Sequence, residues 1–231
     1  MRLFFSTLLL ICVVCSLHAQ IRLSNPGVPA KENLVYAEKI GTQTGVLKQT
    51  VALKTENNKT YYEIVTNGTL SDIVYRVDAK TLDGFYSQTV ERNPDSTIRR
   101  ELEILSSSPK IAADELLVSD LNSLPFSLRG FPWGKINFAK LAFSGVSSTS
   151  SFSLELNIQG VEKLKIGGKS YECYKVQMGL GGILGGFVPM SFFWYSTQSP
   201  NILVRYEGSQ GGPGSPVRVL ELQSYEAAEA K

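Results

Sequence analysis

The feature that most constrains this chain is the alternation of apolar and polar residues within short stretches that turn-forming residues separate. In Ser71–Asp78, Ile73, Tyr75 and Val77 occupy alternate positions, and mostly charged residues lie between them. A period of two residues places the two sets of side chains on opposite faces of a β-strand. The pattern therefore predicts an antiparallel sheet with one face toward a core and the other toward solvent.

About a dozen stretches have this character. Strands are expected at 34–40, 44–54, 60–66, 71–78, 85–92, 97–105, 135–144, 151–159, 161–166, 171–178, 192–197, 202–207 and 217–225. A flat open sheet of so many strands is unusual, so we expect a curved antiparallel sheet that forms a half-barrel or barrel. An outer-membrane barrel is a weaker alternative, because the solvent-type faces carry Arg, Glu and Lys in many strands.

The alternation breaks between residues 109 and 134. Asp114 and Glu115 precede an apolar stretch, which predicts one short helix at 112–121. Residues 124–134 should form an ordered loop whose aromatic side chains point toward apolar surroundings. Both sides of this break show the same β pattern, so we interpret it as a crossover within one all-β domain.

The first 19 residues have the composition of an export signal. Arg2 precedes the apolar run 3–17, which is too short to span a bilayer, and Ala19 suits signal peptidase. We expect cleavage after Ala19 and export to the periplasm or the outer membrane. An uncleaved anchor, or lipidation at Cys15, is the alternative. Residues 20–32 should then form an extended arm, 33–225 a single β domain and 226–231 a disordered tail.

Removing this segment also removes the chemistry of several enzyme classes. The only histidine of the chain is His18, and of three cysteines only Cys173 would remain. Catalytic triads, His-based zinc sites and intramolecular disulfides are then impossible. We expect no enzymatic activity, no cofactor and no metal. Cys173 is interpreted as a small residue in a packed strand, with a reactive free thiol as the alternative.

Charge gives no reason to expect a nucleic-acid partner. The formal net charge of +2 falls to +1 when Arg2 is removed, whereas nucleic-acid-binding surfaces are strongly basic. Arg205 and Glu207 point the same way from one expected strand, and Glu221 on the next can join them. We interpret them as a structural ion pair, with a polar group at a cavity mouth as the alternative.

Residues 179–190 are rich in glycine and apolar side chains. The glycines match neither the dinucleotide-binding pattern nor a phosphate-binding loop. Two interpretations remain open: an apolar loop tucked over the sheet, or an exposed lip that touches lipid or gates a cavity. In the second, the contact residues would include Ile183, Leu184, Phe187 and Val188.

Three motifs resemble an exported bacterial family catalogued as domain of unknown function 3108. They are the segment from Tyr75 to Leu82, the hairpin strand from Tyr171 to Val176 with Cys173, and the pair formed by Trp194–Ser196 and Leu203–Gly208. The resemblance implies a curved sheet similar to that of periplasmic lipoprotein carriers, whose concave apolar face can hold an acyl chain. It supplies no catalytic residues.

These observations together predict a monomeric, non-enzymatic envelope protein that binds a lipid or other hydrophobic ligand and touches the membrane peripherally. The expected ligand-binding residues are Phe126, Phe131, Trp133, Ile183, Leu184, Phe187, Trp194 and Tyr195. The alternative is an envelope scaffold that docks a partner through a sheet edge or an aromatic loop. A histidine-free hydrolase that uses carboxylates ranks last.

Overall fold

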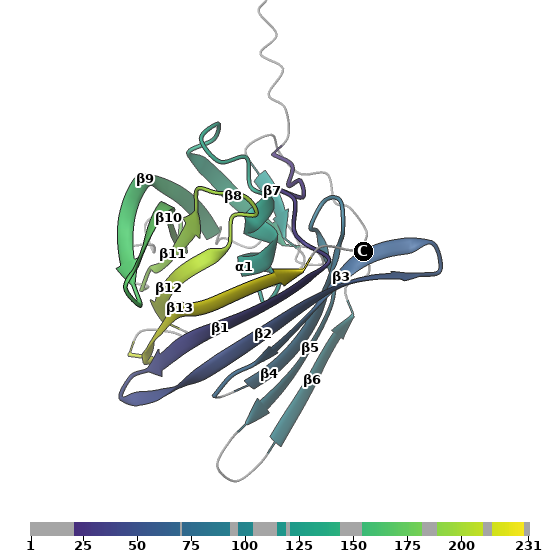
Figure 1. Ribbon diagram of the computed structural model, residues 1–231, viewed down its shortest axis with the longest axis horizontal. Helices are drawn as coiled ribbons and strands as arrows, with labels where there is room; N and C mark the ends of the chain where they lie inside the picture. The colour runs from purple at the N-terminus through teal and green to yellow at the C-terminus, as the bar shows by residue number, and fades with distance from the viewer. Residues whose placement is uncertain are drawn as a thin grey trace, which may run out of the picture.

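The computed structural model describes residues 21–69, 71–92, 97–103, 115–118, 121–143, 154–181, 189–209 and 214–228. Within these ranges thirteen strands form one sheet in the order β6-β5-β4-β3-β2-β1-β13-β12-β11-β10-β9-β8-β7. All neighbouring pairs are antiparallel except β7 and β8. The prediction of an all-β chain with a curved antiparallel sheet and one short helix is confirmed (Figure 1). The predicted signal segment lies outside the described residues.

The first half of the sheet is a meander of long hairpins. Its strands are β1 (Lys31–Ile40), β2 (Gln43–Glu56), β3 (Lys59–Asn67), β4 (Ser71–Asp78), β5 (Gly84–Arg92) and β6 (Thr97–Glu103). The second half contains β7 (Glu115–Val118), β8 (Phe138–Phe143), β9 (Leu154–Ile166), β10 (Lys169–Leu180), β11 (Ser191–Ser196), β12 (Leu203–Ser209) and β13 (Val217–Ala228). Because β13 pairs with β1, the two halves join in the middle of the sheet.

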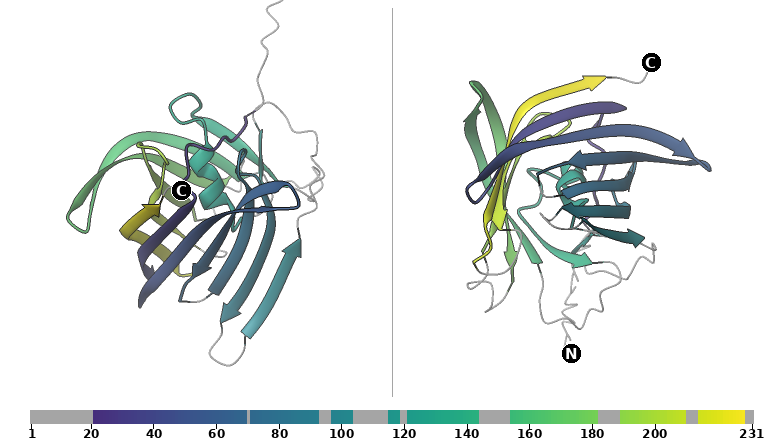
Figure 2. Two further views of the ribbon diagram at one scale, coloured as in Figure 1. Left: turned by 45° about the vertical axis from the view of Figure 1, so that its right-hand side comes forward. Right: turned by 90° about the horizontal axis from the view of Figure 1, so that it is seen from below.

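The sheet curls so that its two halves face each other across the helix α1 (Leu124–Ser127) (Figure 2). Register shifts interrupt the pairing at Val35/Tyr36, Arg76/Val77, Lys175/Val176 and Trp194/Tyr195. Such β-bulges bend a strand and increase its twist. At one of them Gly160 adopts a positive φ of 116°, and β9 continues through it as one strand. The two strands expected at 151–159 and 161–166 are therefore a single bent strand.

The helix expected at 112–121 is wrong. Within that range the described residues Glu115–Val118 form strand β7, which pairs in parallel with β8. Leu116 and Val118 are buried and alternate with less buried neighbours, so the packing requires a period of two. The α-helical turn comes later, at α1, where Pro125 occupies the start of the helix, and the short 3₁₀ helix η1 (Leu128–Gly130) follows it.

The buried side chains form two clusters. The first joins Tyr36, Ile64 and Val77 from the first half of the sheet with residues of the second half such as Leu222, and the other includes Leu156 and Phe193 from the second half. The α1–η1 segment contributes to both, because Phe126 belongs to the first cluster while Leu124 and Leu128 belong to the second. This segment therefore fills the space between the two walls.

Both ends of the described β domain pack against the sheet. Residues 21–30 are extended, but Ile21 and Leu23 pack in the second cluster and Val28 packs in the first. Asn25 also donates from Nδ2 to the carbonyl oxygen of Ala79 at 2.8 Å. At the other end of the chain, β13 extends to Ala228 and pairs with β1 there, so the first three residues of the expected tail belong to a strand.

A buried ion pair fixes the α1–η1 segment inside the sheet. Arg129 donates from Nη1 and Nη2 to the two carboxylate oxygens of Glu32 on β1, at 2.6 and 2.9 Å. Arg129 also donates from Nε to the carbonyl oxygen of Pro200, and Tyr225 donates to Glu32 at 2.8 Å. The side chains of Arg129 and Glu32 are 3% and 0% exposed. We call this set the closed end of the barrel.

Arg129→Met should lower the free energy of unfolding by about 3–5 kcal/mol, because it leaves the Glu32 carboxylate buried without its counter-ion. Urea denaturation measures this loss. The double variant Glu32→Gln/Arg129→Met should lose less than the single variant. Arg205→Met removes a more exposed arginine that contacts two carboxylates, those of Glu207 and Glu221, and it should lose about 1 kcal/mol or less. Equal losses for Arg129→Met and Arg205→Met would contradict the structural role of the buried pair.

Candidate ligand-binding site

The curled sheet and the α1 segment enclose a partly open cavity of about 610 Å³. Both halves of the sheet contribute to it, and α1 supplies part of its floor. The apolar and aromatic residues that line it are Tyr36, Leu47, Ile73, Tyr75, Leu121, Leu124, Pro125, Met178, Phe193, Leu203, Tyr206 and Leu220. The volume lies within the range of roughly 300–1,000 Å³ typical of small-molecule sites.

The floor of the cavity is held by hydrogen bonds to backbone carbonyls. Tyr195 donates to the carbonyl oxygen of Pro125 at 2.8 Å, and Tyr36 donates to that of Leu203 at 3.0 Å. Both phenols are deeply buried, and this burial raises the pKa of each well above its ordinary value. The two hydroxyls therefore stay protonated at neutral pH and act as donors that position lining residues.

The polar residues that line the cavity lie at two levels. Ser71, Ser191, Ser209 and Arg218 lie toward the end opposite the Arg129–Glu32 pair, whereas Gln49, Thr66, Thr89 and Asn122 lie deeper, because Gln49 pairs with Leu34 and Asn122 precedes α1. In the register of the sheet, Arg218 lies beside Ile40 at the end of β1 and beside Gly208 near the end of β12. Glu32, in contrast, lies at the start of β1. We call the end of the cavity at Arg218 the open end, and the polar residues Ser71, Ser191, Ser209 and Arg218 its rim.

A second Arg–Glu pair lies at this open end. Glu38 on β1 is 1% exposed, accepts a hydrogen bond from Arg218 Nη2, and accepts another from the backbone N–H of Thr69 at 2.8 Å. Burial alone raises the pKa of Glu38, but the hydrogen bonds from Thr69 and the Arg218 guanidinium lower it further than burial raises it. The net pKa is below the ordinary value, so Glu38 is ionised at neutral pH.

The aromatic residues expected to bind a ligand occupy three different places. Phe131, Trp133 and Tyr195 form one aromatic cluster, in which Trp133 lies 4.9 Å from Phe131 and 5.2 Å from Tyr195 between ring centroids. Phe126 packs in the other core cluster, with its ring 4.9 Å from the Arg129 guanidinium. None of these four residues lines the cavity, but Phe126 and Tyr195 directly support the segment that forms its floor.

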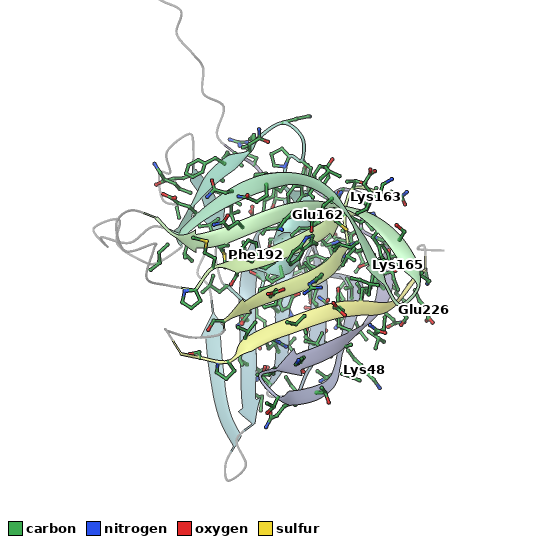
Figure 3. The ribbon with its side chains drawn as sticks, turned by 90° about the vertical axis from the view of Figure 1, so that its left-hand side faces the viewer. Lys48, Glu162, Lys163, Lys165, Phe192 and Glu226 are labelled. Carbon is green, nitrogen blue, oxygen red and sulfur yellow. The ribbon has the colours of Figure 1, made fainter. Side chains whose placement is uncertain are left out.

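Trp194 alternates with the cavity-lining Phe193, so it lies on the other side of β11 from the cavity, where it is buried in the first core cluster. Its indole N–H donates to Glu162 at 2.5 Å, and Lys175 and Arg205 each lie 5.3 Å from its ring. Figure 3 shows Glu162 and Phe192 on this side of the sheet. Arg205 donates there to Glu207 at 2.8 Å and to Glu221 at 2.9 Å. The group consequently lies on the other side of the sheet from the cavity.

The remaining expected contacts, Ile183, Leu184 and Phe187, lie outside the described residues. The residues that the sequence interpretation missed are those at the open end, above all Glu38 and Arg218, and the inward-facing Phe193 and Tyr206. Alternation gives a signal for Phe193, because it shares a strand face with Tyr195. The pairing of Glu38 with Arg218 joins residues 180 positions apart, and no local pattern indicates it.

Neither family models nor curated proteins match this sequence. The resemblance to domain of unknown function 3108 thus gains no support from a family model. Within the described residues, no helix has the length and apolar character needed to cross a membrane.

Several solved structures have a similar chain course. A β-barrel-like protein of domain of unknown function DUF1849 from Brucella abortus aligns with a TM-score of 0.44 and 10% identity, over 90% of this chain and all of that one. A DUF1329 family protein from Desulfovibrio piger aligns with a TM-score of 0.32 and 9% identity, over 87% of each chain. A LolA superfamily protein from Nitrosomonas europaea aligns with a TM-score of 0.26 and 8% identity, over 89% of each chain. At these values the likenesses carry no functional argument.

The pair at the open end should make stability depend on pH in a defined direction. The folded-state pKa of Glu38 is depressed, so its contribution is present above the unfolded pKa of about 4.3 and is lost as pH falls through the lower folded value. The stability advantage of the wild-type protein over Glu38→Gln should therefore shrink below about pH 4. Urea denaturation of both proteins at pH 7, 5 and 3 measures it, and a constant difference would contradict the assignment.

Cys173 should be unreactive in the folded protein. Burial, together with the carboxylates of Glu162 and Glu172, raises the pKa of its thiol to about 12, and only the thiolate is a good nucleophile. Alkylation by iodoacetamide at pH 8 should be slower than in urea-unfolded protein by more than about 100-fold. Similar rates in the two states would instead support the reactive-thiol interpretation.

Proposed function

We propose that this protein is a non-enzymatic binding protein of the bacterial cell envelope that holds a hydrophobic ligand inside its curled sheet. The observation that carries the proposal is the cavity of about 610 Å³ between the two halves of the sheet, with a mostly apolar and aromatic lining. In a well-packed domain of this size such a space would be filled by side chains. A large concave space lined by apolar groups and a few polar groups is the usual form of a ligand site.

The arrangement of charges supports binding rather than catalysis. Among the described residues that line the cavity, Arg218 is the single charged one. Its partner Glu38 is buried, and the carboxylate oxygens of Glu38 accept hydrogen bonds from Arg218 and from the backbone N–H of Thr69. A carboxylate-based hydrolase needs two carboxyl groups that converge on the substrate, and the described lining contains none. The export signal predicted for the first 19 residues is consistent with the proposed location in the envelope.

Docking of a partner at a sheet edge is the second candidate function. The described sheet ends at β6 on one side and β7 on the other, and an edge strand can accept a further strand. Docking at an edge would use the outer strands of the sheet but gives no role to the cavity inside it, whereas ligand binding gives the cavity a role. Native mass spectrometry of protein purified from the envelope, followed by lipid extraction, tests the choice. Protein free of any bound or extractable hydrophobic molecule would argue against ligand binding.

A substitution that fills the cavity should abolish binding without unfolding the protein. Ile73 lines the cavity from β4, whereas its neighbour Val74 points to the opposite face of the same strand. Ile73→Trp should therefore reduce the amount of bound hydrophobic probe by about tenfold or more. Val74→Trp places the same side chain outside and serves as the matched control. We would measure titration with an environment-sensitive fluorescent probe, together with a thermal melt of each variant. Equal binding by the two variants would refute the assignment of the cavity.

A further inference from the structure

The open end of the cavity has a charge arrangement that restricts the kind of ligand head group it can bind. Arg218 lies at the rim, where its register neighbours are Ile40 and Gly208. Its side chain is 14% exposed, and its Nη2 donates to the nearly inaccessible Glu38. The positive charge at the rim is thus already balanced by a carboxylate that is held in place from the other side by the backbone N–H of Thr69.

A balanced pair does not favour an anionic head group. A carboxylate or phosphate that approached Arg218 would also approach the ionised Glu38, and in partly buried surroundings like charges repel strongly. None of the other described residues that line the cavity carries a positive charge to offset that repulsion. The electrostatics of the open end therefore disfavour fatty-acid carboxylates and phosphate esters.

Arg218 nevertheless has a donor to offer. Its Nε–H is buried and has no hydrogen-bond acceptor among the described residues. A buried donor without a partner is unfavourable, and an uncharged oxygen can satisfy it without disturbing the pair with Glu38. The nearby rim residue Ser71 provides a further hydroxyl group. The open end thus matches the carbonyl or hydroxyl oxygen of a neutral head group.

We propose that the cavity selects an uncharged amphiphile, with a single apolar chain on the aromatic floor and an ester, amide or alcohol oxygen bound by Arg218. This inference rests on the proposed function, because it names the ligand class of the same cavity. The chain contacts Phe193, Leu124 and Leu203, and the head group lies toward the rim. Glu38 determines selectivity, because it keeps the arginine from attracting anions.

A competition experiment tests the proposal. Purified protein is incubated with equal concentrations of monopalmitoylglycerol and palmitate at pH 7.5, and native mass spectrometry measures the ratio of the two complexes. The wild-type protein should prefer the monoacylglycerol by about tenfold or more. Glu38→Gln leaves the guanidinium without its counter-ion, so this variant should shift the preference toward palmitate by at least about tenfold.

Two further variants make the result specific. Glu38→Gln/Arg218→Met removes both charges and should bind the two ligands with little preference. Glu63→Gln removes a carboxylate from the outer face of β3, where Glu63 pairs with Lys54 and Arg76, and it should behave as the wild type. A thermal melt of every variant checks that it is folded.

The outcomes separate this inference from the proposed function. If the wild-type protein binds neither ligand, the proposed function fails and this inference fails with it. If it binds both equally, or prefers palmitate, the binding function stands and the selectivity proposed here is wrong. A preference for monoacylglycerol that persists unchanged in Glu38→Gln and in the double variant would also overturn the role assigned to the Glu38–Arg218 pair.

Discussion

The rest of the architecture depends on the buried ion pair between Arg129 and Glu32. These residues lie 97 positions apart in the chain, so the pair ties the segment after α1 to the first strand. Two charged side chains that are buried away from water are tolerated only when their hydrogen bonds are satisfied. Tyr225 donates a further hydrogen bond to Glu32, and the carbonyl oxygen of Pro200 accepts one from Arg129. Because the contact is bidentate, it fixes the direction of the arginine as well as its position. The helix is thereby held across the inside of the sheet.

Much of the sheet could be predicted from the sequence because the signal for a strand is local. Alternation at a period of two survives in almost every strand, and glycine or asparagine marks many of the turns. The failures occur where distant contacts decide the outcome. Leu116 and Val118 form a strand because their backbone pairs with β8 and their side chains pack in the second core cluster. The sequence near them indicates neither the pairing nor the packing. Gly160 bends β9 instead of ending it, because its positive φ serves a bulge rather than a turn.

The candidate site was harder to predict than the fold. It depends on which face of a strand each side chain occupies and on ion pairs between residues far apart in the chain. Trp194 and Tyr195 are consecutive in one strand, so their side chains leave it on different sides, and the buried Trp194 packs in the first core cluster on the side away from the cavity. Aromatic character alone does not distinguish a residue that lines a cavity from one that supports its wall, as Tyr195 does through Pro125. The decisive polar pair, Glu38 and Arg218, joins opposite ends of the chain, and only the pairing of β1 with β13 brings them together.

The two Arg–Glu pairs inside the sheet differ in how completely their hydrogen bonds are satisfied. Arg129 uses both terminal nitrogens on Glu32 and its Nε on Pro200, so no donor nitrogen of its guanidinium lacks a partner. Arg218 contacts Glu38 through a single nitrogen, and its Nε has no acceptor among the described residues. The guanidinium of Arg129 has no donor left for a further partner, whereas the buried Nε of Arg218 can still donate to an acceptor that enters the cavity. The one guanidinium nitrogen of this pair that lacks a described acceptor, Nε of Arg218, therefore belongs to a residue at the rim of the cavity.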